Sequence, residues 1–263
     1  MSCRLGKWLL ALLPAFAGAA ACAATPAPLT FCVEDVVQRP WTSPAGVGLN
    51  FELLKMVEKR LGEHFNYVFR PWKRCLEEVR LGRLDGIVGA ADSPERRTFA
   101  VFPLLADGRV DPSRELFQER YHVFLRAGGK ASWDGHQLRT PGNTVLVQAG
   151  YVIASVARER GLQPNELVKS SEEGLRMVAD GIAEAAILYG DESERLAYED
   201  PRFAGRVVGA PQPYWVTHLF LMVGRRSEAR DPQRIAAIWR AIGAVRQTQE
   251  YQKIEASSLF SPP

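Results

Sequence analysis

Apolar positions in the first third of the chain follow two alternating spacings. Short runs rich in apolar residues alternate with stretches in which apolar residues recur every three or four positions. The elements expected from these spacings are a strand at 29–34, a helix at 48–61, a strand at 65–69, a helix at about 72–81 and a strand at 84–90. Gly62 and Gly82 follow the two helices, as is typical of helix ends. This order, with short connections, predicts a parallel, doubly wound sheet.

The same pattern starts again in the second half of the chain, after a break at Gly128-Gly129. A strand is expected at 121–126, before this break. Beyond it we expect strands at 145–148, 185–189 and 219–223, and helices at 151–160, 172–180 and about 232–251. A second break lies at 211–213, where two prolines flank Gln212. Two breaks around a second α/β unit predict two chain crossings between two lobes, a layout suited to hinge closure. We expect lobe 1 at 25–126 and 214–263, and lobe 2 at 127–213.

The first 24 residues have the order of a secretory signal. Arg4 and Lys7 give a positive start, 8–16 is an apolar run too short to span a bilayer, and 15–24 is almost entirely small residues. We therefore expect removal of 1–24 and export to the periplasm. The small residues before position 25 allow cleavage there, and 19–22 loosely resembles a lipoprotein box, so lipid attachment at Cys22 is an alternative.

Charge and cysteine usage narrow the class of protein. The chain has 33 Lys plus Arg against 30 Asp plus Glu, a near-balance that argues against nucleic acid or an anionic membrane surface as the main partner. Two of the four cysteines lie in the expected signal, which leaves Cys32 and Cys75 to form a disulfide in an oxidising compartment. Two buried thiols are the alternative. The four histidines are scattered without metal-ligand spacing, so we expect no metal and no cofactor.

Three short motifs in the first lobe resemble those of a known family. They are Pro71-Trp72-Lys73-Arg74-Cys75, Gly82-Arg83-Leu84-Asp85-Gly86 and Ser93-Pro94-Glu95-Arg96-Arg97 before Phe102-Pro103. In this stretch the chain resembles the family 3 solute-binding proteins, the type II periplasmic binding proteins that serve polar amino acid transport. The resemblance extends over nearly the whole chain after the signal. It implies two lobes, each a mainly parallel sheet flanked by helices, that close on a small ligand.

The resemblance also implies roles for single residues. Arg96 matches the arginine that holds a ligand carboxylate, a task that suits a planar guanidinium with five N–H donors. Ser93 matches a threonine that could donate its hydroxyl to the same oxygens. Gly150 and Tyr151 match the start of a helix whose free amides face the ligand. A solvated arginine and a plain loop are the alternatives for these positions.

Aromatic and acidic candidates complete the expected site. Trp41, Trp72 and Tyr189 lie at predicted strand ends or breaks, where ligands bind in open α/β sheets. For any single ring, core packing is the better explanation. Amino acid binders of the family place an aspartate at the position of Tyr189, so this chain departs from the pattern. Glu34, at the end of the first strand, could supply the missing negative charge.

The leading hypothesis is a binding protein without catalysis. It would capture a small polar ligand bearing a carboxylate, an amino acid or similar, and deliver it as a monomer to an inner-membrane ABC permease. One alternative is a periplasmic enzyme of the cyclic-acid dehydratase type, which needs a positioned acid or base; Glu34, Glu184 and Asp191 are available, but no nucleophile and base are paired. A sensor or accessory protein on the same fold is the other alternative.

Overall fold

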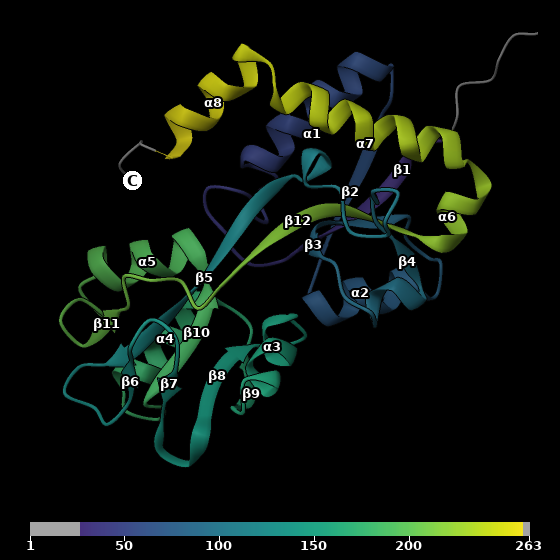
Figure 1. The fold of residues 1–263 in the computed structure, drawn as a ribbon. Coiled ribbons are helices and arrows are strands. Elements are labelled where there is room, and N and C mark those ends of the chain that lie inside the picture. Colours follow the sequence, from purple (N-terminus) through teal and green to yellow (C-terminus); the bar gives the residue numbers. More distant parts are fainter. Residues whose placement is uncertain (1–26, 260–263) are drawn as a thin grey trace, which may run out of the picture.

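The computed structural model describes residues 27–259, which form two lobes joined by two long strands (Figure 1). The expected signal at 1–24, including Cys22, lies outside the described residues. None of the described helices is long and apolar enough to cross a membrane.

The first lobe holds the parallel sheet predicted from residues 29–91. β1 pairs in parallel with β2 and with β3, and β12 (Trp215–Gly224) adds an antiparallel strand beside β3. Its elements are β1 (Leu29–Glu34), α1 (Leu49–Leu61), β2 (Phe65–Arg70), α2 (Trp72–Arg80), β3 (Gly86–Ala91), β4 (Ala100–Val101), α6 (Arg225–Arg230), α7 (Pro232–Arg246) and α8 (Gln249–Leu259). Helices α1, α7 and α8 lie on one side of this sheet and α2 on the other (Figure 1).

The second lobe repeats the arrangement with a different strand order. β8 pairs in parallel with β9 and with β10, and β10 is antiparallel to β5 (Phe117–Arg126). Its elements are β6 (Ser132–Trp133), β7 (Leu138–Arg139), β8 (Thr144–Gln148), α3 (Ile153–Glu159), β9 (Gln163–Val168), α4 (Ser171–Ala179), β10 (Ala185–Tyr189), α5 (Gly190–Glu199) and β11 (Val207–Gly209). A separate apolar core that includes Phe124, Leu175 and Leu188 stabilises this lobe.

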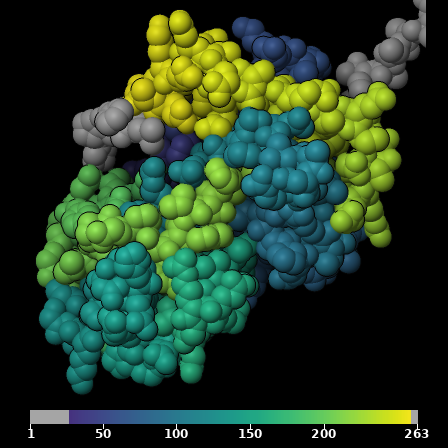
Figure 2. Space-filling model, in the orientation of Figure 1, coloured from purple at the N-terminus to yellow at the C-terminus, as the bar shows by residue number. Residues whose placement is uncertain are grey.

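The two lobes are joined by β5 (Phe117–Arg126) and β12 (Trp215–Gly224). These strands pair with each other, from Phe117 opposite Leu219 to Tyr121 opposite Trp215. Beyond this shared section β12 continues along β3 and β5 continues along β10. The crossings are therefore continuous strands, and Figure 2 shows the two lobes meeting along them.

Among the elements missed in the sequence are β9 and α5, and one expected helix was too long. β9 contains Pro164, and α5 follows β10 without any break, so neither carries an ordinary start signal. The long helix expected at 232–251 is two helices, α7 and α8. The second begins where the Thr248 hydroxyl accepts a hydrogen bond from the Tyr251 amide at 3.2 Å, which is a typical N-cap.

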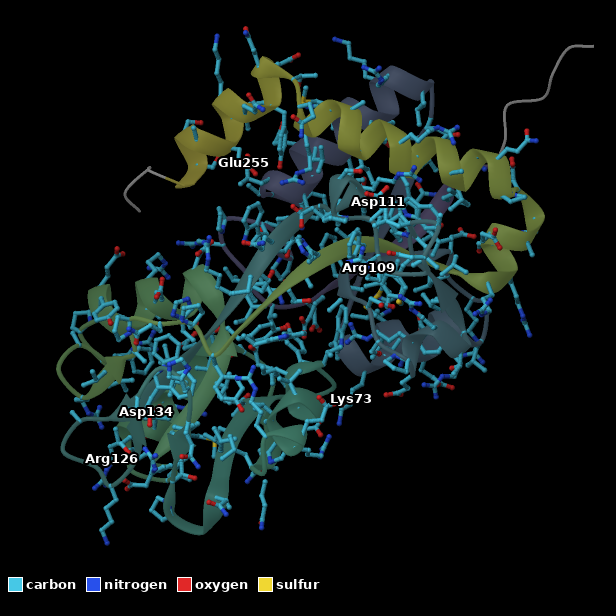
Figure 3. The ribbon with its side chains drawn as sticks, viewed as in Figure 1. Lys73, Arg109, Asp111, Arg126, Asp134 and Glu255 are labelled. Carbon is cyan, nitrogen blue, oxygen red and sulfur yellow. A yellow bond between two sulfur atoms is a disulfide. The ribbon has the colours of Figure 1, made fainter. Side chains whose placement is uncertain are left out.

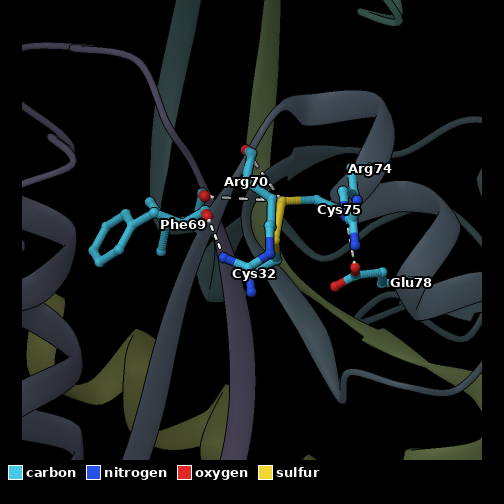
Figure 4. The surroundings of a disulfide bond; sticks show 7 residues. Cys32, Phe69, Arg70, Arg74, Cys75 and Glu78 are labelled. Atoms are coloured by element: carbon cyan, nitrogen blue, oxygen red, sulfur yellow. Dashed lines mark hydrogen bonds and ion pairs between the residues drawn. A yellow bond between two sulfur atoms is a disulfide. The ribbon is translucent and has the colours of Figure 1, made fainter.

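The expected disulfide between Cys32 and Cys75 is present, with an S–S distance of 2.08 Å. It joins β1 to α2 inside the first lobe (Figure 4). Both residues are fully buried. The bond therefore ties the helix that begins at Trp72 to the strand that ends at Glu34.

Candidate ligand-binding site

A small cavity lies where the two lobes meet. Its volume is about 10 Å³, which is close to the least that holds one water molecule. The walls come from strand ends of both lobes and from the turn before α3, in the arrangement expected for open α/β sheets. The lining residues are Glu34, Gln38, Trp72, Gly89, Ala91, Arg96, Tyr121, Tyr151, Val152, Tyr189 and Leu219. We call this cavity the inner pocket.

The Arg96 guanidinium is buried in the wall of the inner pocket with only 5% of the residue exposed. Nη1 donates to the Ala91 carbonyl at 2.7 Å, and Nη2 donates to the Gly150 carbonyl at 3.2 Å. The guanidinium carbon also lies 5.1 Å from the centre of the Trp72 ring, a cation–π distance. Within residues 27–259 no carboxylate forms an ion pair with it. Burial lowers the pKa of Arg96 to about 10, so the side chain stays charged at neutral pH.

Glu34 is the carboxylate that faces the inner pocket from the first lobe. Its Oε2 accepts hydrogen bonds from the Tyr151 hydroxyl and, at 2.9 Å, from Gln38 Nε2. Burial is the main cause that raises the pKa of Glu34 to about 8, against the lowering effect of these hydrogen bonds. At neutral pH the side chain is therefore mostly protonated and supplies little negative charge.

The Gly150-Tyr151 turn of the second lobe reaches into the first lobe. The Gly150 carbonyl accepts from Arg96 and also, at 3.0 Å, from Trp72 Nε1. The Gly150 amide donates to Glu166 Oε2 at 3.0 Å, so this amide already has an anionic partner. The helix after the turn begins at Ile153, two residues later than expected. The sequence suggested that free amides of this turn face the ligand. In the structure, the turn instead contacts the first lobe through the Gly150 carbonyl and the Tyr151 side chain.

Tyr189, at the end of β10, brings a second buried carboxylate to the site. Its hydroxyl hydrogen-bonds the Glu119 side chain, which also accepts from the Gly190 amide at 2.8 Å. Burial first, and the nearby Asp191 second, raise the pKa of Glu119 well above its ordinary value. The ring of Tyr189 packs edge-on against Tyr121 and Tyr151. Three tyrosine rings therefore pack together in the wall of the inner pocket.

Two other predicted residues lie at the edge of the site or outside the lining. The Ser93 hydroxyl accepts from the Arg96 amide at 3.2 Å and so holds the turn that carries the arginine. Trp41 stacks face to face on Phe117 with ring centres 4.0 Å apart, which is core packing.

Two polar residues of the lining, Gln38 and Tyr121, were missed in the sequence, as was Glu119 beside them. Gln38 lies in a loop, where its amide oxygen accepts from the Thr42 hydroxyl at 3.0 Å. Tyr121 and the adjoining Glu119 belong to β5, which begins four residues earlier than the strand expected from Tyr121. Only the pairing of β5 with both β10 and β12 places these side chains between the lobes. No local pattern indicates this.

A larger groove opens beside the inner pocket. Its volume is about 600 Å³, and its walls are α2, the segment 92–99 and α3 with Glu166. Arg96, Tyr151 and Val152 line both spaces, so the groove ends at the guanidinium. Lys73 lies on its first-lobe wall, beside the second lobe (Figure 3). We call this space the outer groove.

Comparison with solved structures gives many matches at low sequence identity. The ligand-binding core of GluR0 from Nostoc punctiforme in complex with L-glutamate is 17% identical, with a TM-score of 0.68 over 89% of this chain and 100% of that one. A histidine kinase sensor domain with similarity to periplasmic binding proteins is 17% identical, with a TM-score of 0.67 over 89% and 96%. AncCDT-1, an ancestral amino acid-binding protein and precursor of cyclohexadienyl dehydratase, is 18% identical, with a TM-score of 0.64 over 88% and 95%.

The chain has the fold of a type II periplasmic binding protein. This confirms the fold class expected from the motifs at 71–103, with two lobes and two crossings. No protein-family model matches the sequence, and no curated protein sequence matches it. At these identities the matches establish the fold, and the site of this chain has to be argued from its own residues.

Proposed function

We propose that this protein is a periplasmic solute-binding protein whose ligand carries a carboxylate that is held by Arg96. The observation that supports this most strongly is the buried guanidinium itself. A buried cation without an acidic partner is costly, and here its direct hydrogen-bond partners are two carbonyl oxygens. A ligand carboxylate would supply both the charge and the bidentate geometry that the guanidinium prefers.

Closure of the two lobes would complete the site. Arg96 belongs to the first lobe and Tyr151 to the second, and both line the inner pocket and the outer groove, so a ligand held by Arg96 contacts both lobes. A ligand favours closure only to the extent that it binds the closed arrangement better than the open one. The paired section of β5 and β12 is the natural hinge, with lobe 2 at about 127–213 moving against the rest. The closed form would then dock on an ABC-type permease.

Two other outputs fit the same binding event. One solved match is a histidine kinase sensor domain, which supports a sensor role as the alternative to transport. Another is described as a precursor of a dehydratase, and Glu34 is a mostly protonated acid at neutral pH, as a general acid must be. Turnover of a cyclic carboxylic acid would favour that second alternative.

A thermal-shift screen of the purified protein tests the proposal. The panel would hold amino acids, small carboxylates, polyamines and short peptides. A ligand at 100 times its Kd stabilises the folded state by about 2.7 kcal/mol, which raises the Tm visibly. We expect carboxylates to give the shift and polyamines to give none.

Two arginine variants control the screen. Arg96→Lys removes the bidentate donor pair and should abolish the ligand-induced shift. Arg97→Lys changes the neighbouring side chain, which does not line the inner pocket and pairs with Asp92 at a distance of 2.7 Å. This variant should keep the ligand-induced shift. A shift that survives in Arg96→Lys would refute the proposed carboxylate contact.

A further inference from the structure

The inner pocket offers too little room for an amino acid beside Arg96. About 10 Å³ remains there, whereas sites for small molecules measure several hundred Å³. The rings of Tyr121, Tyr151 and Tyr189 occupy the remaining space, and Tyr151 is fixed by its hydrogen bond to Glu34. A carboxylate can reach the guanidinium most readily from the outer groove, which Arg96 also lines.

The inner pocket also gives poor compensation to a positive group. An α-amino acid carries its ammonium one carbon away from its carboxylate, so both charges would lie next to Arg96. The nearest acid, Glu34, already accepts hydrogen bonds from Tyr151 and Gln38. Burial keeps the pKa of that acid at about 8, so it is mostly neutral at pH 7. The inner end of the site therefore favours an anion and disfavours a cation.

The lining of the outer groove, in contrast, carries more negative than positive side chains once Arg96 is left out. Its lining holds five carboxylates, namely Glu77, Asp92, Glu95, Glu159 and Glu166. Apart from Arg96 it holds three cations, namely Lys73, Arg80 and Arg158. Because Arg97 pairs with Asp92 from outside the lining, one negative charge remains in excess. Arg80 and Arg158 are already paired with groove carboxylates at 3.4 Å and 2.6 Å. A cationic group is therefore favoured in the groove, away from Arg96.

Glu159 is the groove carboxylate best placed to receive that cation. It is exposed at the last turn of α3, and within residues 27–259 no ion pair includes it. Tyr151 lies just before the same helix, and the seven residues of α3 span about 10 Å. A fully extended tripeptide spans about 10 Å, so its two ends could approach Arg96 and Glu159 together.

We infer that the ligand is an extended zwitterion, with its carboxylate on Arg96 and its cationic group in the outer groove near Glu159. Tyr151 closes the inner end of the groove and excludes ligands that need room behind the carboxylate. This inference rests on the proposed function, because it keeps the same contact at Arg96. It adds that the two charges of the ligand lie several bonds apart, as in a short peptide or an ω-amino acid.

Calorimetric titration with five probes tests this inference. The probes are alanine, 6-aminohexanoate, trialanine, N-acetyl-trialanine and trialanine amide. We expect trialanine to bind at least ten-fold more tightly than alanine, and 6-aminohexanoate to bind more tightly than alanine as well. Removing either charge of trialanine, as the acetyl and amide derivatives do, should weaken binding at least ten-fold.

One variant and its control assign the cation to Glu159. Glu159→Gln should weaken trialanine several-fold and leave N-acetyl-trialanine unchanged, whereas Glu250→Gln, an exposed acid on α8, should change neither. Alanine binding as tightly as trialanine, or equal binding of the acetyl derivative, would overturn the inference and leave the carboxylate contact intact. Equal binding of the amide would instead overturn the proposed function. If none of the five binds, the inference is wrong, and the wider panel decides the proposed function separately.

Discussion

The hydroxyl of Tyr151 donates a hydrogen bond to the Glu34 carboxylate across the junction of the two lobes. Both side chains are buried, and Gln38 Nε2 contacts both of them, at 2.9 Å from Glu34 and 2.5 Å from the hydroxyl. Together with the contacts of the Gly150 carbonyl, this bond holds the second lobe against the first. The closed arrangement therefore depends on a few polar groups that ligand binding would have to rearrange.

Tyr151→Phe removes the cross-lobe bond with little change in volume. We expect the free energy of unfolding to fall by about 1–2 kcal/mol, because a buried acid loses one of its donors. The lobes should also open more readily, which small-angle X-ray scattering would show as a larger radius of gyration. Tyr198→Phe is the control, since that exposed hydroxyl contacts the Gly209 carbonyl within the second lobe. Identical scattering from Tyr151→Phe and the original protein would mean that the bond does not hold the lobes.

Glu34 should make the stability of the protein depend on pH in a defined direction. Its pKa is about 8 in the folded protein, against an ordinary value of 4.5. Between these values the folded state holds a proton that the unfolded state has released, so stability falls as pH rises from about 4.5 to 8. Each pH unit in this window costs about 1.4 kcal/mol.

Urea unfolding of the original protein and of Glu34→Gln at several pH values isolates this effect. The amide has a similar shape and does not titrate, so the difference between the two unfolding free energies should grow in favour of Glu34→Gln from pH 5 to pH 8. Other groups titrate equally in both proteins and cancel. A constant difference across the range would contradict the raised pKa.

Gly150→Ala should disturb the junction of the two lobes by a steric clash, in addition to the backbone strain that any side chain causes at this φ. Gly150 has φ of 78°, and an added Cβ would lie 3.1 Å from Lys73 Cγ and 3.2 Å from Trp72 Cδ1. Gly161→Ala is the matched control, because its φ is 80° and nothing lies within 4 Å. Both variants should lose about 1 kcal/mol of stability from backbone strain. Only Gly150→Ala should enlarge the radius of gyration, and equal scattering from the two would argue against a tight junction there.

Removal of the disulfide should destabilise the first lobe. The bond closes a loop with a sequence separation of 43 residues, for which loop-closure entropy gives about 4 kcal/mol. The Cys32→Ser, Cys75→Ser double variant should therefore unfold at a clearly lower urea concentration. Dithiothreitol should lower the midpoint of the original protein to a similar value and leave the double variant unchanged. No effect of the reductant on the original protein would mean that the bond contributes nothing.

Residues at strand ends could be predicted from the sequence, and residues brought in by pairing over long range could not. Glu34, Trp72 and Arg96 follow short apolar strands or open a helix, so the α/β order alone places them at one edge of the sheet. Glu119 and Tyr121 lie inside β5, where a side chain faces the junction only because of how β5 pairs with β10 and β12.

The sequence also could not distinguish aromatic residues of the site from aromatic residues of the core. Trp41 and Tyr189 both lie at ends or breaks in the pattern, yet Trp41 packs on Phe117 and Tyr189 lines the inner pocket. The amides at Gly150 and Tyr151 were expected to be free, but the Gly150 amide donates to Glu166 on the neighbouring strand β9. Because β9 was not predicted, that partner could not be foreseen.

The position of β12 has a consequence for how the chain acquires its structure. In the sheet β12 lies between β3 and β5, and its partner residues in β3 precede it by the whole length of the second lobe. The second lobe is built mainly from consecutive segments and can assemble from local contacts, whereas the first lobe stays incomplete until Trp215–Gly224 has been synthesised. A nascent chain therefore holds the edges of β3 and β5 unpaired until late and depends on protection from aggregation until the last strand arrives.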